Sequence, residues 1–195
     1  RVAGLPSEGT APYALMVFAG LLPWLLFSKV ITRGLGSMVS NSSLILKVYF
    51  PRVLLPAAVT LATMVTWGVE IAVLSIALVI IGGMPLPFLP LVVLAMVALA
   101  AFALGLAMIL GILNARFRDT EHFVSIILPM WMWLSPVIYP ITLVQDAARE
   151  FGEWILVIYQ FNPFVYFLDV FRRLLYDNRI PDAEPTLIMT LVSAI

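Results

Sequence analysis

Four long apolar runs constrain this chain more than any other feature of its sequence. They cover about residues 12–31, 54–81, 88–113 and 123–143. Each is long enough for the ~20 residues that an α-helix needs to cross the hydrocarbon core of a bilayer. The runs do not alternate polar and apolar residues as barrel strands do, and only helices and closed barrels satisfy every backbone polar group in lipid. We therefore predict an all-α, polytopic bundle of membrane helices.

A further apolar run at 186–195 is only half that length. The chain also begins with Arg1 rather than Met, and it has no basic region followed by a cleavage site that would indicate a signal peptide. We expect a piece of a longer protein, with one transmembrane domain over residues 1–195 that stops inside a further span.

Composition agrees with a lipid environment and removes several classes of function. Of 195 residues, 63% are hydrophobic and 11% charged, against about 45–50% and about 25% in a soluble domain. The net charge of zero argues against a nucleic-acid partner. Without cysteine, and with His122 as its one histidine, the chain lacks the usual ligands for a metal site. Neither lysine, Lys29 or Lys47, follows a glycine, so no phosphate-binding loop is present and ATP must bind another subunit.

The basic residues orient the predicted spans. The links after the first and third runs carry Lys and Arg, whereas the short link after the second run is uncharged. Cytoplasmic loops carry the excess of Lys and Arg, so residues 32–53 and 114–122 are predicted to lie in the cytoplasm. The 82–87 turn and the 144–185 connection are then predicted to lie on the outer side of the membrane.

The 144–185 connection contains an apolar stretch that resembles a fifth span. Glu153 and Asp169 interrupt it, and a charged group at mid-bilayer costs roughly 2.5–3.5 kcal/mol even on the mildest scale. We predict instead two short helices over about 147–176, broken at Asn162–Pro163 and either re-entrant or lying at the outer interface.

A basic, amphipathic segment joins the first two runs. It reads NSSLILKVYFPRVLLP over 41–56, after residues 34–40, which look flexible and polar enough to leave the membrane. A cap at Asn41, Ser42 or Ser43 and a stop at Pro51 predict a cytoplasmic helix of about 41–51. On periodicity and charge alone, the favoured reading is a surface helix whose lysine reaches the headgroups, and the alternative is a helix offered to a partner protein.

Three motifs together resemble the permease subunits of ABC-2-type exporters, especially those that export O-antigen, teichoic acid and capsular glycans. The 41–56 segment is similar to the one after that family's second span. LNARFRDTEHFVSIILPMWMWLSPVIYP, 113–140, resembles its Asn-x-x-Phe/Tyr-Arg-Asp turn and the following helix that ends in Ser-Pro-x-x-Tyr-Pro. FNPFVYFLDVFRRLLY, 161–176, is similar to its Asn-Pro stretch before the final span. These motifs are specific for the family and not for its cargo.

The resemblance implies about six spans in the full subunit, of which this chain covers roughly spans two to five and the start of six. It also implies a homodimer, two ATPase subunits that bind ATP and Mg, a lipid-linked glycan as substrate and contact with membrane lipid. The cytoplasmic helix becomes a coupling helix docked on the ATPase. The residues implied in that contact are Asn41, Lys47, Tyr49, Phe50 and Arg52. Arg118 and Asp119 could pair locally, or form a second contact with the ATPase or with the entering lipid-linked head group.

Glu70 is the candidate for the substrate pathway inside the second run. An ionisable group within a span is costly and is by default a functional-site hypothesis. It could line the pathway, pair with a cation of the dimer partner, stay protonated and hydrogen-bonded, or lie in a wet cavity.

Aromatic side chains could stack on sugars, although tryptophan and tyrosine at span ends are more often interfacial anchors. The candidates in or near spans are Trp24, Phe27, Trp67, Trp131, Trp133 and Tyr139. Trp131 and Trp133 point to different sides of a helix, whereas Trp131 and Ser135, four residues apart, share a face beside a kink at Pro136. We take Trp131, Ser135 and Tyr139 as candidate pathway residues.

Small residues at four-residue spacing allow another helix to approach the third run closely. They are Ala101 with Gly105 and Ala107 with Gly111, and the sequence leaves open which helix is the neighbour. Two rival functions also stay open. One is an exporter of drugs or small lipids, and the other is a non-transporting scaffold or embedded enzyme, which the lack of a nucleophile, base or metal set disfavours.

Overall fold

The described part of the chain is built from helices. The computed structural model describes residues 13–41, 51–82, 85–152, 154–176 and 183–193. Within these ranges the regular elements are α-helices and one short 3-10 helix, which confirms the predicted all-α fold. In chain order they are α1 (Tyr13–Ser40), α3 (Leu54–Ile80), η1 (Leu86–Phe88), α4 (Leu89–Arg116), α5 (Thr120–Leu134), α6 (Ile141–Phe151), α7 (Trp154–Gln160), α8 (Pro163–Leu175) and α9 (Ala183–Ser193).

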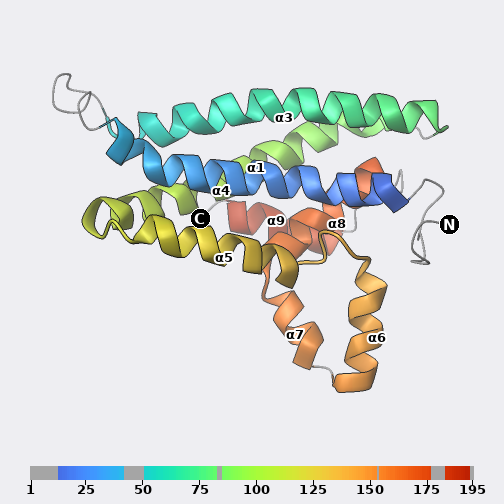
Figure 1. The fold of residues 1–195 in the computed structure, drawn as a ribbon. Coiled ribbons are helices and arrows are strands. Elements are labelled where there is room, and N and C mark those ends of the chain that lie inside the picture. The colour runs from blue at the N-terminus through green and yellow to red at the C-terminus, as the bar shows by residue number, and fades with distance from the viewer. Residues whose placement is uncertain (1–12, 42–50, 83–84, 153, 177–182, 194–195) are drawn as a thin grey trace.

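Three long helices form the main body of the bundle. Among the described residues, α1, α3 and the η1–α4 segment are each long and apolar enough to cross a membrane. They lie lengthwise beside one another in Figure 1, and α1 packs against both α3 and α4. In its most apolar window α1 is 56% buried, against 33% for each of the other two. Helix α1 is therefore the central span of this bundle.

Helix α1 continues further than the sequence predicted. Residues 34–40, predicted to be a flexible link, form the last two turns of the helix, which ends at Ser40. Gly34 and Ser37 are buried there, and the Ser37 hydroxyl donates to the Gly34 carbonyl at 2.6 Å. Packing against α4 accounts for these turns, because tertiary contacts supply most of the stability of helices in proteins.

The run at 123–143, predicted as the fourth span, is not one helix. Helix α5 ends at Leu134, and the chain is non-helical until α6 begins at Ile141. Ser135 has extended backbone angles, φ −100° and ψ 142°, because the proline that follows disfavours helical geometry in the residue before it. The prolines at 136 and 140 therefore break the segment where a kink was predicted.

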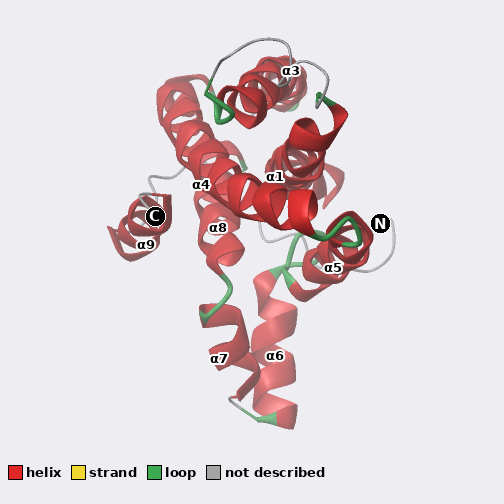
Figure 2. Cartoon of the chain, turned by 90° about the vertical axis from the view of Figure 1, so that its left-hand side faces the viewer, coloured by secondary structure: helices red, strands yellow, loops and turns green. Residues whose placement is uncertain are grey.

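Three short helices, rather than two, follow this break. Helices α6 and α7 pack against each other and project from the bundle across the direction of the long helices (Figures 1 and 2). Helices α7 and α8 meet at a bend of 79°, and the break lies at Asn162–Pro163, as predicted. If this bent pair counts as one span, the described residues contain up to four candidate spans.

An aromatic cluster joins α1, α4, α5 and α8 at the centre of the bundle. The Phe27 ring is fully buried, and its centroid lies 5.2 Å from that of Trp131, 5.3 Å from Phe164 and 5.8 Å from Phe102. Ring pairs at such distances contribute about 0.5–1.5 kcal/mol each beyond the area they bury. The burial of Phe27 in this cluster places it in the core and away from a sugar-binding surface.

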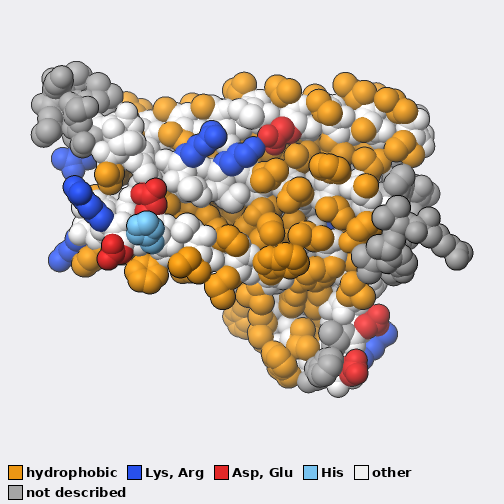
Figure 3. Space-filling view, in the orientation of Figure 1, with side chains coloured by type: hydrophobic (Ala, Val, Ile, Leu, Met, Phe, Trp, Pro, Cys, Tyr) orange, Lys and Arg blue, Asp and Glu red, His pale blue; other side chains and the backbone are white. Residues whose placement is uncertain are grey.

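The outer faces of the long helices are apolar. Hydrophobic side chains cover most of the face seen in Figure 3, and the charged ones gather mainly near its ends and at one place over α1 and α3. Large exposed apolar side chains on α3 and α4 include Val65, Val69, Val73, Ile76, Ile109 and Ile112. An apolar surface of this extent is typical of contact with lipid or with another protein.

Candidate functional site

Those predicted ATPase contacts that the structure describes lie toward one end of the bundle. The end of α1, the start of α3 and the turn between α4 and α5 lie together at the left of Figure 1. Arg52, Arg118 and Asp119 are exposed there, and no ion pair joins the last two among the described residues. Asn41 closes α1 and donates from Nδ2 to the Ser37 carbonyl at 2.8 Å.

The predicted coupling helix itself lies largely outside the described residues. Its residues 42–50 include three of the predicted contacts, Lys47, Tyr49 and Phe50. The roles of all seven predicted ATPase contacts stay predictions.

Close packing joins α1 to α4 at this end. A Cβ added at Gly34 would lie 2.8 Å from Cβ of Ala107, and one added at Gly111 would lie 3.8 Å from the Leu35 backbone. The buried Asn114 also donates from Nδ2 to the Leu35 carbonyl at 3.4 Å. The neighbour of the Ala107–Gly111 pair is therefore α1 of the same chain. A Cβ at Gly105 would meet nothing within 4 Å, so the other small pair faces open space.

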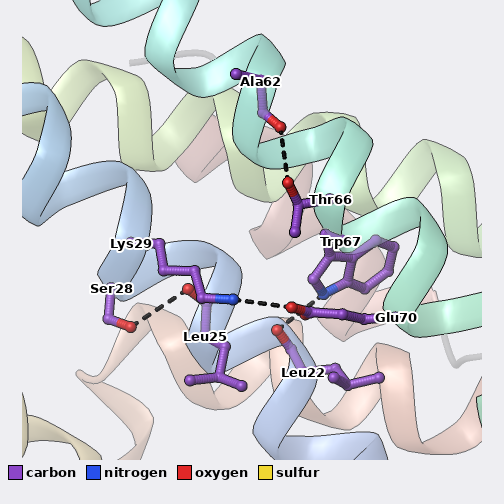
Figure 4. A network of polar contacts seen from close by, with 8 residues as sticks. All are labelled: Leu22, Leu25, Ser28, Lys29, Ala62, Thr66, Trp67 and Glu70. Carbon is purple, nitrogen blue, oxygen red and sulfur yellow. Dashed lines mark hydrogen bonds and ion pairs between the residues drawn. The ribbon is translucent and has the colours of Figure 1, made fainter.

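An ion pair crosses between α1 and α3 within the spans. Lys29 Nζ lies 2.9 Å from Glu70 Oε1, as Figure 4 shows, and the two side chains are 32% and 28% exposed. The second oxygen of Glu70, Oε2, is buried and has no hydrogen-bond partner among the described residues. Of the alternatives for Glu70, pairing with a cation is therefore observed, and that cation belongs to its own chain rather than to a dimer partner. Its role in a pathway stays a prediction.

Other polar groups lie near this pair. Trp67, one turn before Glu70, donates from Nε1 to the Leu22 carbonyl at 2.8 Å and is buried. The Ser28 and Thr66 hydroxyls bond to carbonyls of their own helices at 3.3 and 3.2 Å (Figure 4). We call the surface formed by Ser28, Lys29, Arg33, Thr66 and Glu70 the α1–α3 polar face.

Trp131 and Ser135 meet at Asn162. The Trp131 Nε1 group donates to Asn162 Oδ1 at 3.0 Å, and Asn162 Nδ2 donates to Ser135 Oγ at 2.8 Å. The same Oδ1 accepts from the Phe164 backbone at 3.1 Å, so Asn162 also caps α8. Ser135 is fully buried in this network, so its side chain has no surface to offer a substrate in this structure. Trp131 also borders an apolar groove of about 520 Å³ between α5 and the α7–α8 bend.

Tyr139 lies in the break between α5 and α6. Its hydroxyl donates to the Trp133 carbonyl at 2.9 Å and lies 2.6 Å from the Tyr159 hydroxyl on α7. Trp133 is 63% exposed, whereas Trp24 and Trp67 are buried. Of the aromatic candidates, Trp133 therefore has the largest exposed fraction for contact with lipid or ligand.

Two side chains that the sequence analysis did not single out hold the backbone of this break. Arg172 on α8 donates from Nη2 to the Val137 carbonyl at 2.9 Å, and the Tyr13 hydroxyl on α1 donates to the Ile138 carbonyl at 2.7 Å. Buried backbone groups need partners, and lipid supplies none. The sequence signalled the freed carbonyls through the two prolines of the break but not their partners, because Arg172 and Tyr13 lie 35 and 125 residues away from the carbonyls they bind.

Comparison with known proteins places the chain in a family. The family model of the ABC-2 type transporter matches residues 3–176. The chain belongs to this family. With three apolar helices of membrane length among its described residues, this ABC-2 family member is a membrane protein, and the resemblance seen in its motifs is confirmed.

Characterised relatives share a single description. The O-antigen export system permease protein RfbA of Myxococcus xanthus is 29% identical over 184 residues, which is 94% of this chain and 68% of the relative. Two proteins of the same name from Klebsiella pneumoniae are 28% and 27% identical, over 83% and 86% of this chain. The chain spans 60% and 62% of the length of those two, less than two thirds of each.

Proposed function

We propose that this chain is the membrane-spanning part of an ATP-driven exporter that moves a lipid-linked polysaccharide outward across a bacterial inner membrane. The observation that carries the proposal is its match to the ABC-2 family along residues 3–176, together with relatives named for O-antigen export. The helical architecture agrees, because α1, α3 and α4 are long enough to cross a bilayer.

The proposed driving force is supplied from outside the chain. Two separate ATPase subunits bind ATP and Mg, and their closure pushes on the 41–52 segment and on the turn at Arg118 and Asp119. The end of α1 and the start of α3 flank that segment directly. A push on it would act on the central span α1 and on the peripheral span α3, which adjoin it in the chain.

The proposed pathway lies between two copies of the chain. Each copy would offer surfaces that its own packing leaves exposed, and Trp131, Tyr139 and Glu70 remain the candidates to line it. The arm formed by α6 and α7 lies on the side that the charge pattern places outside, where an emerging glycan passes it.

Deletion of the gene tests the function directly. With transport lost and synthesis intact, lipid-linked glycan should accumulate on the cytoplasmic side, and surface glycan should disappear from immunoblots of whole cells. Restoring the gene should restore the surface signal. Unchanged surface glycan with altered drug tolerance would instead identify an exporter of drugs or small lipids.

Purification of the full-length protein tests the proposed partners. A tagged permease should bring down a nucleotide-binding subunit and a second copy of itself. Replacing Lys47 and Arg52 together by Glu should weaken that association, because it reverses two charges in the segment proposed to touch the ATPase. The matched control, Arg149→Glu, reverses a charge that is 80% exposed on α6 and far along the chain from that segment. Isolation without any ATPase would support the scaffold alternative.

A further inference from the structure

The α1–α3 polar face carries one more positive than negative charge. Lys29 and Arg33 are one helical turn apart on α1, and Glu70 is the acid that contacts Lys29. Arg33 is exposed, and no carboxylate among the described residues lies within ion-pair distance of it. Figure 3 shows positive and negative side chains together over α1 and α3, with hydrophobic ones along part of their border. A cation in such an apolar setting requires an anionic or polar partner.

The depth of Arg33 matches a lipid headgroup, and Lys29 lies one turn deeper. At 1.5 Å per residue, Arg33 lies roughly 10 Å along the helix from the end of α1 at Ser40, and Lys29 lies roughly 16 Å from it. Helix α1 is 28 residues long, so its length of about 42 Å matches a whole bilayer of about 40–45 Å. Arg33 therefore lies near the boundary between headgroups and hydrocarbon, on the side that the charge pattern places in the cytoplasm.

The donors available to a ligand are the two cations. The hydroxyls of Ser28, Thr32 and Thr66 already donate to carbonyls of their own helices, at 3.3, 2.8 and 3.2 Å. Side chains one turn apart on a helix have Cβ atoms about 5–6 Å apart, a separation that a phosphate or pyrophosphate group can bridge. The guanidinium of Arg33 is suited to bidentate phosphate binding, and Lys29 acts as a point charge beside it.

Apolar side chains are exposed on α1 and α3 beyond the cations, toward the start of α1. Val73 lies one turn beyond Glu70 on α3 and is 63% exposed, and Phe18, about three turns before Lys29 on the same side of α1, is 51% exposed. A ligand with a charged head and a long hydrocarbon tail fits both parts of this surface. A soluble phosphate compound would leave the apolar part uncovered.

We propose that Lys29 and Arg33 bind the phosphate group of a lipid, and that the ligand is the pyrophosphate of the lipid-linked substrate as it enters from the cytoplasmic side. Glu70 holds Lys29 in place while the site is empty, and Lys29 turns from Glu70 to the phosphate when the site is filled. The identification of the substrate as the ligand depends on the proposed function, whereas the phosphate site depends on the charges of the polar face alone.

The test is lipid binding by the purified full-length permease in detergent, followed by native mass spectrometry. The probes are undecaprenyl pyrophosphate, undecaprenol, which has the same tail and no phosphate, and phosphatidylglycerol. We expect the pyrophosphate to bind, undecaprenol not to bind, and Arg33→Gln to weaken binding by roughly tenfold, which is the loss of one charge-assisted contact. The matched control is Arg116→Gln, which removes a cation from the end of α4 instead.

Lys29 needs a paired variant, because Lys29→Gln alone leaves Glu70 without its partner and can impair folding. Lys29→Gln with Glu70→Gln removes both charges and should also weaken pyrophosphate binding. If phosphatidylglycerol competes as well as undecaprenyl pyrophosphate, the phosphate site stands and the substrate is ruled out as its particular ligand. Equal pyrophosphate binding by the wild type and Arg33→Gln would overturn the proposal.

Two further outcomes distinguish this proposal from a contact with the second copy and from the proposed export function. If Arg33→Gln dissociates the dimer and leaves lipid binding intact, the partner of Arg33 is a carboxylate of the second copy and the proposal is wrong. The proposed function is tested independently by surface glycan in the deletion strain. Lost export on deletion together with unchanged lipid binding in Arg33→Gln would overturn the site and leave the exporter in place.

Discussion

Gly20 is the position where the structure predicts the sharpest effect of a single methyl group. A Cβ added there would lie 2.7 Å from the Val137 carbonyl oxygen, 3.1 Å from Cδ1 of Leu168 and 3.2 Å from Nη2 of Arg172. The first of these atoms belongs to the backbone of the break between α5 and α6, and the same oxygen accepts from Arg172 at 2.9 Å. Gly20→Ala must therefore displace the break or α1.

The magnitude follows from two opposing terms. Overpacking of this kind costs about 1–3 kcal/mol, and replacing a helical glycine by alanine returns about 0.5–1 kcal/mol. The net destabilisation is then about 0–2.5 kcal/mol. At about 2–4 °C per kcal/mol for a chain of this size, the expected fall in Tm is at most roughly 10 °C.

The matched control lies in the same helix. A Cβ at Gly36 would meet nothing within 4 Å, so Gly36→Ala should leave Tm unchanged or raise it by the alanine term alone. Both variants of the full-length permease are melted in the same detergent at one scan rate, with aggregation followed by size-exclusion chromatography. A Tm for Gly20→Ala equal to or above that for Gly36→Ala would refute the close approach of α1 to the break.

Three other experiments test separate parts of the structure. Asn162→Ala should destabilise the protein by about 2–4 kcal/mol in the same melt, because it removes a helix cap and two side-chain partners. Asn162→Asp should recover most of that loss. Equal Tm values for the two variants would contradict the hydrogen-bond network around Asn162. Glu70→Gln alone should destabilise the protein more than the double variant that also carries Lys29→Gln, with a coupling energy of roughly 1–3 kcal/mol for this partly exposed pair. Additive losses of stability would contradict the ion pair. The chain has no cysteine, so a single thiol can be introduced at position 47 or 146. When intact cells or spheroplasts meet an impermeant maleimide, Lys47→Cys should stay unlabelled and Asp146→Cys should react. The opposite pattern would reverse the predicted topology.

The long spans were predictable because their signal is local. An apolar run needs no partner to indicate a membrane helix, and the predicted bounds 54–81 and 88–113 differ from α3 and α4 by at most three residues. The end of α1 was missed because Gly34 suggests flexibility in the sequence, whereas in the bundle it provides the space for Ala107 to approach. A glycine can indicate a flexible link or a close contact between helices, and only the neighbouring helix decides which of the two applies.

The candidate site divides in the same way. The sequence indicated that Glu70 needs explaining and that Trp131 shares a face with Ser135, since both statements follow from position along a helix. It did not indicate that Lys29 is the partner of Glu70, or that Asn162 forms hydrogen bonds with Trp131 and Ser135. These contacts join residues 41, 31 and 27 positions apart in the chain. Contacts between separate helices depend on packing, which no single run encodes.

The break between α5 and α6 connects these observations through α1. Irregular backbone in a membrane protein needs hydrogen-bond donors from neighbouring elements. Here α1 supplies one such donor, the Tyr13 hydroxyl, and it also approaches the break closely at Gly20. The other end of α1 leads into the predicted coupling helix, and its middle holds Glu70 through Lys29. A movement of α1 along its axis would therefore act on the outer arm, the polar face and the cytoplasmic end together. We expect α1, rather than the more exposed α3 or α4, to be the element that transmits motion along this chain.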